Sequence, residues 1–264
     1  MNKYLIADWE STQQKIVHSV SFMSVSVEES KGWISHGRGK NPEYKKSRQV
    51  TRGTLRRIFI REALEDPSIY ENDHVLLKFG KTIVYGDGQV EIMSFRDAIC
   101  ELLHTAWEHG DGNWLAHSMD NELEMLQVSD AHFKTGLFPK PIRSFPDVST
   151  IPGWSKIAKV CTQQLLTHRC PEFFSRYQAW MTMNGWTQAR FSSRLEDFVR
   201  FVRDDRDYSQ KHIAPSDVED LLSVLLAANP PLDGKSFMVS RPVSSWNGTQ
   251  EKTTSASSRL VHQN

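Results

Sequence analysis

Residues 4–12 read Tyr4-Leu5-Ile6-Ala7-Asp8-Trp9-Glu10-Ser11-Thr12, a short apolar run that ends in two acids. The apolar run predicts a buried strand. Side chains two residues apart in a strand point to the same face, so Asp8 and Glu10 leave the sheet on one side. Two like charges held this close favour a bound cation. The alternative is an exposed acidic turn after the strand.

The rest of the chain predicts an α/β architecture. Apolar residues alternate at 16–27 and form short runs at 74–85, 114–116 and 145–150, which we interpret as strands. Helical spacing of apolar residues predicts helices at 54–64, 95–106, 122–128, 155–169, 173–184, 191–202 and 214–228. Early strands, a mixed middle and a helical end are typical of helices layered on a sheet.

Composition excludes several classes of protein. The chain has 264 residues, 39% of them hydrophobic and 24% charged, which is typical of a globular protein and not of a disordered or fibrous one. No window approaches 18 apolar residues, and three cysteines are too few for a disulfide framework. We therefore expect an intracellular, cytoplasmic protein with no membrane partner. One domain is expected over 1–231, and the Ser- and Thr-rich residues 232–264 are expected to form a flexible tail.

Two further polar patches lie next to predicted apolar elements. Residues 117–123 read His117-Ser118-Met119-Asp120-Asn121-Glu122-Leu123, where a strand gives way to a helix. Residues 212–217 read His212-Ile213-Ala214-Pro215-Ser216-Asp217, just before an apolar helical stripe. Each patch taken alone is also explained by first-turn acids that the helix dipole favours, or by a surface histidine. Strand ends in open α/β sheets are nevertheless where ligands bind.

Taken together and in this order, the three patches resemble the motifs of the DEDDh exonucleases. The resemblance covers about residues 3–228, apart from a basic insertion. It implies a ribonuclease H-like mixed β-sheet flanked by helices, and a 3′-to-5′ exonuclease that uses two Mg²⁺ or Mn²⁺ ions. It also implies that Asp8, Glu10, Glu122 and Asp217 hold the metals and that His212 is the general base. Hard divalent cations prefer carboxylate oxygens, and a neutral histidine can accept a proton from water.

The second motif departs from the family pattern. Alignment on His117 and Leu123 puts Glu122 where the family has aspartate, whereas the aspartate of this chain is Asp120. We favour Glu122, because Leu123 and Leu126 then keep the apolar face of the helix inward. The departure leaves open an alternative function, an inactive exonuclease-fold module that binds nucleic acid or a protein partner. A purely structural α/β protein is the third hypothesis.

Basic residues are concentrated in one region, although the net charge of the chain is zero. Residues 31–61 contain ten Lys or Arg and a single acid, and we define an insertion at about 31–64. The bland interpretation is a solvated surface. In a nuclease, the same residues would bind phosphates without sequence preference. The predicted contacts are Lys45, Lys46, Arg48, Arg56 and Arg57. The choice between RNA and DNA, and the oligomeric state, stay open.

Overall fold

The protein is built on a mixed sheet of seven strands. The computed structural model describes residues 2–34, 43–70, 90–139, 149–187, 192–210 and 213–230, with the backbone alone at 31–34, 43–47 and 70. The strands are β1 (Asn2–Ser11), β2 (Val17–Ile34), β3 (Glu43–Arg52), β4 (Arg56–Ile60), β5 (Val90–Met93), β6 (Asn113–Ala116) and β7 (Ala158–Cys161). Their order is β5-β4-β2-β1-β6-β7, with β3 also paired to β2. Strand β2 is antiparallel to β1, β3 and β4, and the other pairs are parallel.

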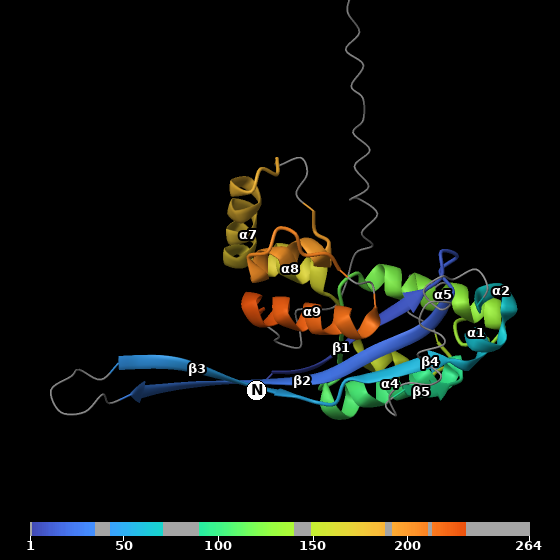
Figure 1. Cartoon of the computed structure of the whole chain (residues 1–264). Helices are drawn as coiled ribbons and strands as arrows, with labels where there is room; N and C mark the ends of the chain where they lie inside the picture. The colour runs from blue at the N-terminus through green and yellow to red at the C-terminus, as the bar shows by residue number, and fades with distance from the viewer. Residues whose placement is uncertain are drawn as a thin grey trace, which may run out of the picture.

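Helices cover both faces of this sheet. They are α1 (Arg61–Glu65), α2 (Pro67–Tyr70), α4 (Phe95–His109), α5 (Met119–Phe133), α6 (Thr162–Arg169), α7 (Pro171–Met183), α8 (Leu195–Arg203) and α9 (Ala214–Ala228), with a 3₁₀ turn η1 (Trp154–Lys156). Apolar residues of α4 and α5 pack with Leu5 and Ala7 of β1, whereas those of α6 to α9 pack with Tyr4 and Ile6. Figure 1 shows α7, α8 and α9 stacked above the sheet and α4 below it. The predicted α/β architecture is confirmed as a mixed sheet flanked by helices.

Local sequence explains the elements that flank the site. The side chain of Ser94 accepts a hydrogen bond from the backbone N–H of Asp97 at 3.1 Å and so begins α4 where the sequence predicts it. Helix α9 has the predicted bounds, with Pro215 in its first turn, where a missing N–H costs nothing. Strand β1 alternates its side chains between the two helical layers, so its even-numbered residues face α9.

Two predicted helices are wrong. Residues 54–64 form β4 and the short α1, because the alternating residues from Arg56 to Ile60 pair with β2 and β5. Residues 155–169 form η1, β7 and α6, because Ala158–Cys161 pair in parallel with β6 at the edge of the sheet. In both places an apolar spacing that is compatible with a helix is overridden by strand pairing.

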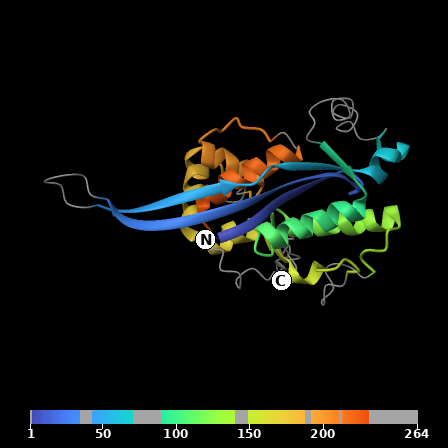
Figure 2. The same ribbon diagram turned by 90° about the horizontal axis from the view of Figure 1, so that it is seen from below.

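Strands β2 and β3 continue together past the end of β1. The register from Glu28↔Gln49 to Ile34↔Glu43 has no counterpart in the pairing of β1, whose last partner in that direction is Val27. Residues 28–34 and 43–49 therefore form a two-stranded arm, which projects from the body in both views (Figures 1 and 2). Within the described part of the predicted basic insertion, residues 31–34, 43–52 and 56–60 are strand and α1 begins at Arg61, so the predicted basic helix is wrong over 56–60. The predicted loop falls largely on residues 35–42, which lie outside the described residues.

Some predictions fall on residues outside those that the structure describes. These are the strand at 74–85, nearly all of the strand at 145–150, and the tail at 232–264. Across the described ranges, no helix is both long enough and apolar enough to cross a membrane.

Candidate functional site

Three acids from the first and third sequence patches meet above the sheet. Asp8 and Glu10 project from β1, and Asp217 comes from the first turn of α9. One carboxylate oxygen from each of the three lies within 4.8 Å of the others. Asp8 and Glu10 are partly buried, and Asp217 is buried. Residues more than 200 positions apart in the sequence thus present their oxygens to one point.

Glu122 from α5 joins this group. Its side chain is buried, and its Oε2 accepts a hydrogen bond of 3.1 Å from the backbone N–H of Trp9, between the two acids of β1. Its charge acts on Asp8, and those of Glu10 and Asp217 act on Glu122. We call Asp8, Glu10, Glu122 and Asp217 the four-carboxylate cluster.

Two members of the cluster, Asp8 and Glu122, resist ionisation. Burial raises the pKa of Glu122 to about 8; the hydrogen bond from Trp9 opposes this shift, and Glu10 and Asp217 add to it. Burial also raises the pKa of Asp8 well above its ordinary value, with further contributions from Glu122, Glu10 and Asp217. These are the two causes, low polarity and like charge, that a bound cation would reverse.

Asp120 and His117, the other polar residues of the second patch, lie elsewhere. Asp120 is close enough to raise the pKa of the Cys161 thiol in β7. His117 points into the α8 layer, where its Nε2 lies 2.7 Å from the backbone oxygen of Ser193 and its ring packs edge-on against Phe198. Burial lowers the pKa of His117 to about 4, so it is neutral at physiological pH. Within the described part of the chain, Glu122 is the member of this patch that reaches the cluster.

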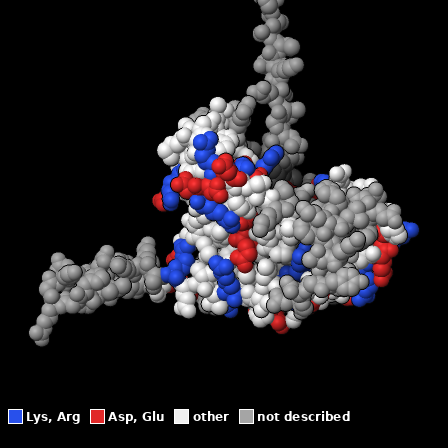
Figure 3. Space-filling model, viewed as in Figure 1, with Lys and Arg blue, Asp and Glu red and all other residues white. Residues whose placement is uncertain are grey.

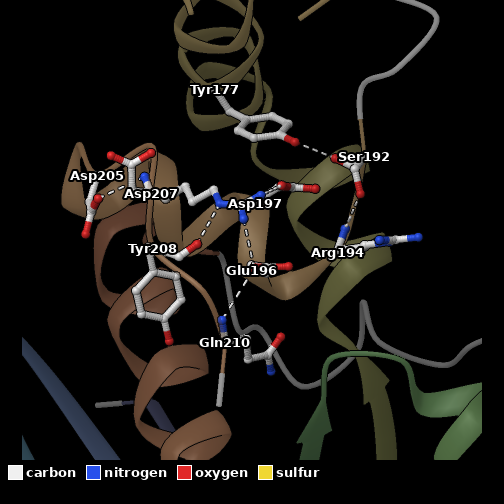
Figure 4. A network of polar contacts seen from close by, with 10 residues as sticks. Tyr177, Ser192, Arg194, Glu196, Asp197, Asp205, Asp207, Tyr208 and Gln210 are labelled. Atoms are coloured by element: carbon white, nitrogen blue, oxygen red, sulfur yellow. Dashed lines mark hydrogen bonds and ion pairs between the residues drawn. The ribbon is translucent and has the colours of Figure 1, made fainter. Parts of the chain in front are cut away.

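Helix α9, which carries Asp217, is tied to α8 by a buried acid one turn further on. Asp220 is 1% exposed; its Oδ1 accepts a hydrogen bond of 2.6 Å from Arg203, and its Oδ2 accepts one from the Tyr208 hydroxyl. The segment after α8 is held in turn by the network of Figure 4. There the Arg200 Nε donates to the backbone oxygen of Tyr208 at 2.8 Å, and Glu196 accepts from the backbone of Gln210 at 3.4 Å. These bonds fix Tyr208 and Gln210, which precede α9 in the sequence.

Three predicted site residues lie outside what the structure describes at the side-chain level. His212 falls between the described ranges 192–210 and 213–230. Lys45 and Lys46 are described by their backbone alone, which pairs with Gly32 and Lys31 in the arm. Their predicted roles therefore stay predictions.

The three predicted arginines have different surroundings. Arg48 donates to the backbone oxygen of Leu226 at 2.9 Å and pairs with Glu29. Arg56 pairs with Glu91 and Glu101, and its guanidinium lies 5.3 Å from the centre of the Phe22 ring on the α4 face. Arg57 lies on the opposite face. Figure 3 shows one side of the molecule, and in the described part of its surface basic and acidic side chains are interspersed. The surface seen in this view is therefore not uniformly positive.

Two serines of β2 lie beside the acids of β1 on the same face of the sheet, and the sequence patterns do not single them out. Ser21 pairs with Asp8 and Ser19 pairs with Glu10, so both serines share the face of the cluster. Both are almost fully buried. The available signal was the alternation of small polar and apolar residues along 16–27, in which the polar positions matched the register of the acids.

Comparisons with family models, with curated proteins and with solved structures find no match for this chain. The chemistry of the four-carboxylate cluster is therefore the observation from which a function can be inferred. Three carboxylate oxygens within 4.8 Å of one another, with the Glu122 carboxylate near them, offer hard ligands, which suit Mg²⁺ or Mn²⁺ better than softer metals.

Proposed function

We propose that this protein is a metal-dependent 3′-to-5′ exonuclease of the DEDDh type, which hydrolyses phosphodiester bonds of RNA or DNA. The observation that carries the proposal is the convergence of the four-carboxylate cluster from β1, α5 and α9. Its members are the four residues for which the sequence resemblance implies metal binding.

The chemistry of the donor set fits a pair of divalent ions. Asp8, Glu10 and Asp217 bring three oxygens within 4.8 Å of one another, and Glu122 adds a fourth carboxylate that is already oriented by the Trp9 N–H. These four residues would hold two Mg²⁺ or Mn²⁺ ions. Such ions lower the pKa of bound water and stabilise charge on the attacking and leaving oxygens of a phosphodiester.

The sheet gives additional support. The central order β4-β2-β1-β6-β7, with β2 antiparallel to both of its neighbours in that order, agrees with the mixed sheet that a ribonuclease H-like fold implies. In this arrangement the acids of β1 lie on a central strand and the acids of α5 and α9 are brought to it from two sides.

His212 is assigned the role of general base. It lies two residues before α9 in the sequence, and Asp217 lies in the first turn of that helix. An imidazole with an ordinary pKa near 6.5 is largely neutral at pH 7 to 8 and can take the proton from the attacking water. This mechanism requires no covalent intermediate between a side chain of the protein and the substrate.

The test is cleavage of single-stranded RNA and DNA, labelled at the 5′ end or at the 3′ end, in the presence of Mg²⁺, Mn²⁺ or EDTA. An exonuclease of this polarity produces a ladder that shortens from the 3′ end, whereas a 3′ label is released at once as mononucleotide. EDTA should abolish both signals.

The matched control uses two acids of one helix. Glu122→Gln and Asp120→Asn make the same chemical change two residues apart, and only the first removes a carboxylate from the cluster. We expect loss of cleavage in Glu122→Gln and near wild-type cleavage in Asp120→Asn. If the wild type cleaves none of these substrates but still binds them, the exonuclease hypothesis is wrong and the alternative, an inactive module that binds nucleic acid, takes its place.

A further inference from the structure

A row of three residues crosses the sheet on the face of the cluster. Asp8 of β1 pairs with Ser21 of β2, and Ser21 pairs with Arg57 of β4. Directly paired residues point to the same face of a sheet, so Arg57 shares the face of Asp8. Two strand spacings of about 4.8 Å separate their backbones, roughly 10 Å in all. Arg57 therefore lies on the same face as the cluster, and its long side chain can extend across part of the distance between the two backbones.

Contacts on that face fix the guanidinium of Arg57 in place. It lies 4.8 Å from the centre of the Phe59 ring, and Phe59 pairs with Ser19, which pairs with Glu10. Burial lowers the pKa of Arg57, and the negative charge of Glu10 opposes this shift. A guanidinium stacked on an aromatic ring loses little freedom when it binds an anion.

Hydrogen bonding leaves Arg57 incomplete. Its Nε is buried, and no residue that the structure describes accepts a hydrogen bond from it. A buried donor without an acceptor is costly. The residue as a whole is only partly buried.

Arg56, the neighbour of Arg57 in the sequence, has acceptors for its guanidinium N–H groups. Arg56 faces the other side of the sheet and donates to Glu91 through Nε at 2.8 Å and through Nη2 at 2.7 Å, and to Glu101 through Nη1. Arg48 is likewise occupied by Glu29 and the backbone of Leu226. Of the three arginines predicted to bind phosphates, Arg57 is the one whose surroundings suit a ligand.

We infer that Arg57 binds a phosphate group of the nucleotide whose scissile bond lies at the four-carboxylate cluster. The inference deepens the proposed function and rests on it. The cluster repels an anionic strand, so a cation fixed nearby adds attraction that the carboxylates cannot supply. A guanidinium offers paired N–H donors that match two phosphate oxygens. The same assignment leaves Arg48 and Arg56 as structural residues, although the sequence grouped them with Arg57.

The experiment compares binding of a nucleoside 5′-monophosphate, of the corresponding nucleoside and of inorganic phosphate, measured by calorimetry in Mg²⁺. None of the three has a phosphodiester bond, so binding is read without turnover. The variants are Arg57→Gln, Arg57→Lys and, as control, Arg52→Gln, which changes an arginine of β3 that is paired with Glu219. Thermal melts and Mn²⁺ affinity are recorded for each variant.

Arg57→Gln should weaken binding of the monophosphate at least about tenfold, the effect of losing a hydrogen bond to a charged group. Binding of the nucleoside should not change. Arg57→Lys should retain part of the affinity, and Arg52→Gln should bind like the wild type. Mn²⁺ affinity should hold or increase in Arg57→Gln, because a positive charge has left the neighbourhood of the cluster.

Three results would overturn the inference. They are unchanged affinity for the monophosphate in Arg57→Gln, an equal loss for monophosphate and nucleoside, and a wild type that binds the monophosphate no better than the nucleoside. Failure of the proposed function is seen separately, as absence of cleavage by the wild type, and does not depend on these binding curves.

Discussion

Replacement of Glu122 by Gln should stabilise the metal-free protein at alkaline pH and destroy its activity. Burial and the neighbouring acids raise the pKa of Glu122 from 4.5 to about 8 in the folded state. A group whose pKa is higher in the folded state contributes stability below its unfolded pKa, and loses this contribution as the pH rises through the folded pKa. The metal-free wild type should therefore lose stability between about pH 5 and about pH 8.

The size of this loss follows from the two pKa values. Each unit of difference is worth about 1.4 kcal/mol, and most of the gap between 4.5 and about 8 is crossed in that pH range, which gives a loss on the order of 3 kcal/mol. Glutamine does not titrate, and its amide oxygen can still accept the hydrogen bond from the Trp9 N–H. The variant should lack this part of the pH dependence while keeping the same shape and the same contact.

The assay is urea unfolding in EDTA at several pH values, followed by the same series in Mg²⁺. Asp120→Asn is the control, because it makes the equivalent change in the same helix outside the cluster. Mg²⁺ should stabilise the wild type more at high pH than at low pH, since the cation binds the ionised acids. At a hundredfold excess over the dissociation constant the gain is about 2.7 kcal/mol. Glu122→Gln should gain much less.

Two results would refute the reasoning. If wild type and Glu122→Gln lose stability in parallel between about pH 5 and about pH 8, Glu122 is not the group that titrates there. If Asp120→Asn, and not Glu122→Gln, removes the response to Mg²⁺, the second-motif carboxylate has been assigned to the wrong residue.

The other predictions concern the remaining parts of the site. Alanine at any other carboxylate of the cluster, as in Asp217→Ala, should abolish most hydrolysis with an unchanged circular dichroism spectrum; wild-type turnover in all three variants would contradict the metal assignment. His212→Ala should lower the cleavage rate by roughly 10²–10⁴-fold and leave Mn²⁺ affinity intact, whereas an equal loss of Mn²⁺ binding would make His212 a ligand. Lys45→Gln combined with Lys46→Gln should weaken binding of single strands equally for all sequences and flatten the salt dependence by about 0.7 per lysine that contacts a phosphate. An unchanged salt slope would remove these lysines from the nucleic-acid interface.

The sequence predicted the acids of the cluster better than it predicted the elements between them. The β1 motif and the α9 helix are predictable because each has an uninterrupted apolar pattern directly next to its acids. The apolar spacing predicts helices where β7 and β4 lie, since both strands are short and their identity depends on pairing with distant strands. Sequence spacing does not contain that pairing.

The choice between Glu122 and Asp120 shows the same limit at the scale of one residue. Both acids lie in the first turn of α5, and the apolar pattern favoured Glu122 only through the direction of Leu123 and Leu126. The structure adds the backbone N–H of Trp9, a contact across 113 positions of the sequence. The division of the basic region also depended on the fold, because Arg56 and Arg57 are neighbours in the sequence but face opposite sides of the sheet.

The buried acids outside the cluster differ from Glu122 in the partners that surround them. Five carboxylates are buried among the residues that the structure describes. Asp130 accepts backbone N–H groups of a following turn, Asp197 pairs with Arg200, and Asp220 is held by Arg203 and Tyr208. The other two, Glu122 and Asp217, belong to the four-carboxylate cluster, and for Glu122 burial together with the charges of Glu10 and Asp217 outweighs the bond from Trp9. Three buried acids are thus compensated by neighbouring groups of the fold, whereas Glu122 lies beside like charges at the point where the proposed cation would bind. This is the pattern expected where stability is given up for function.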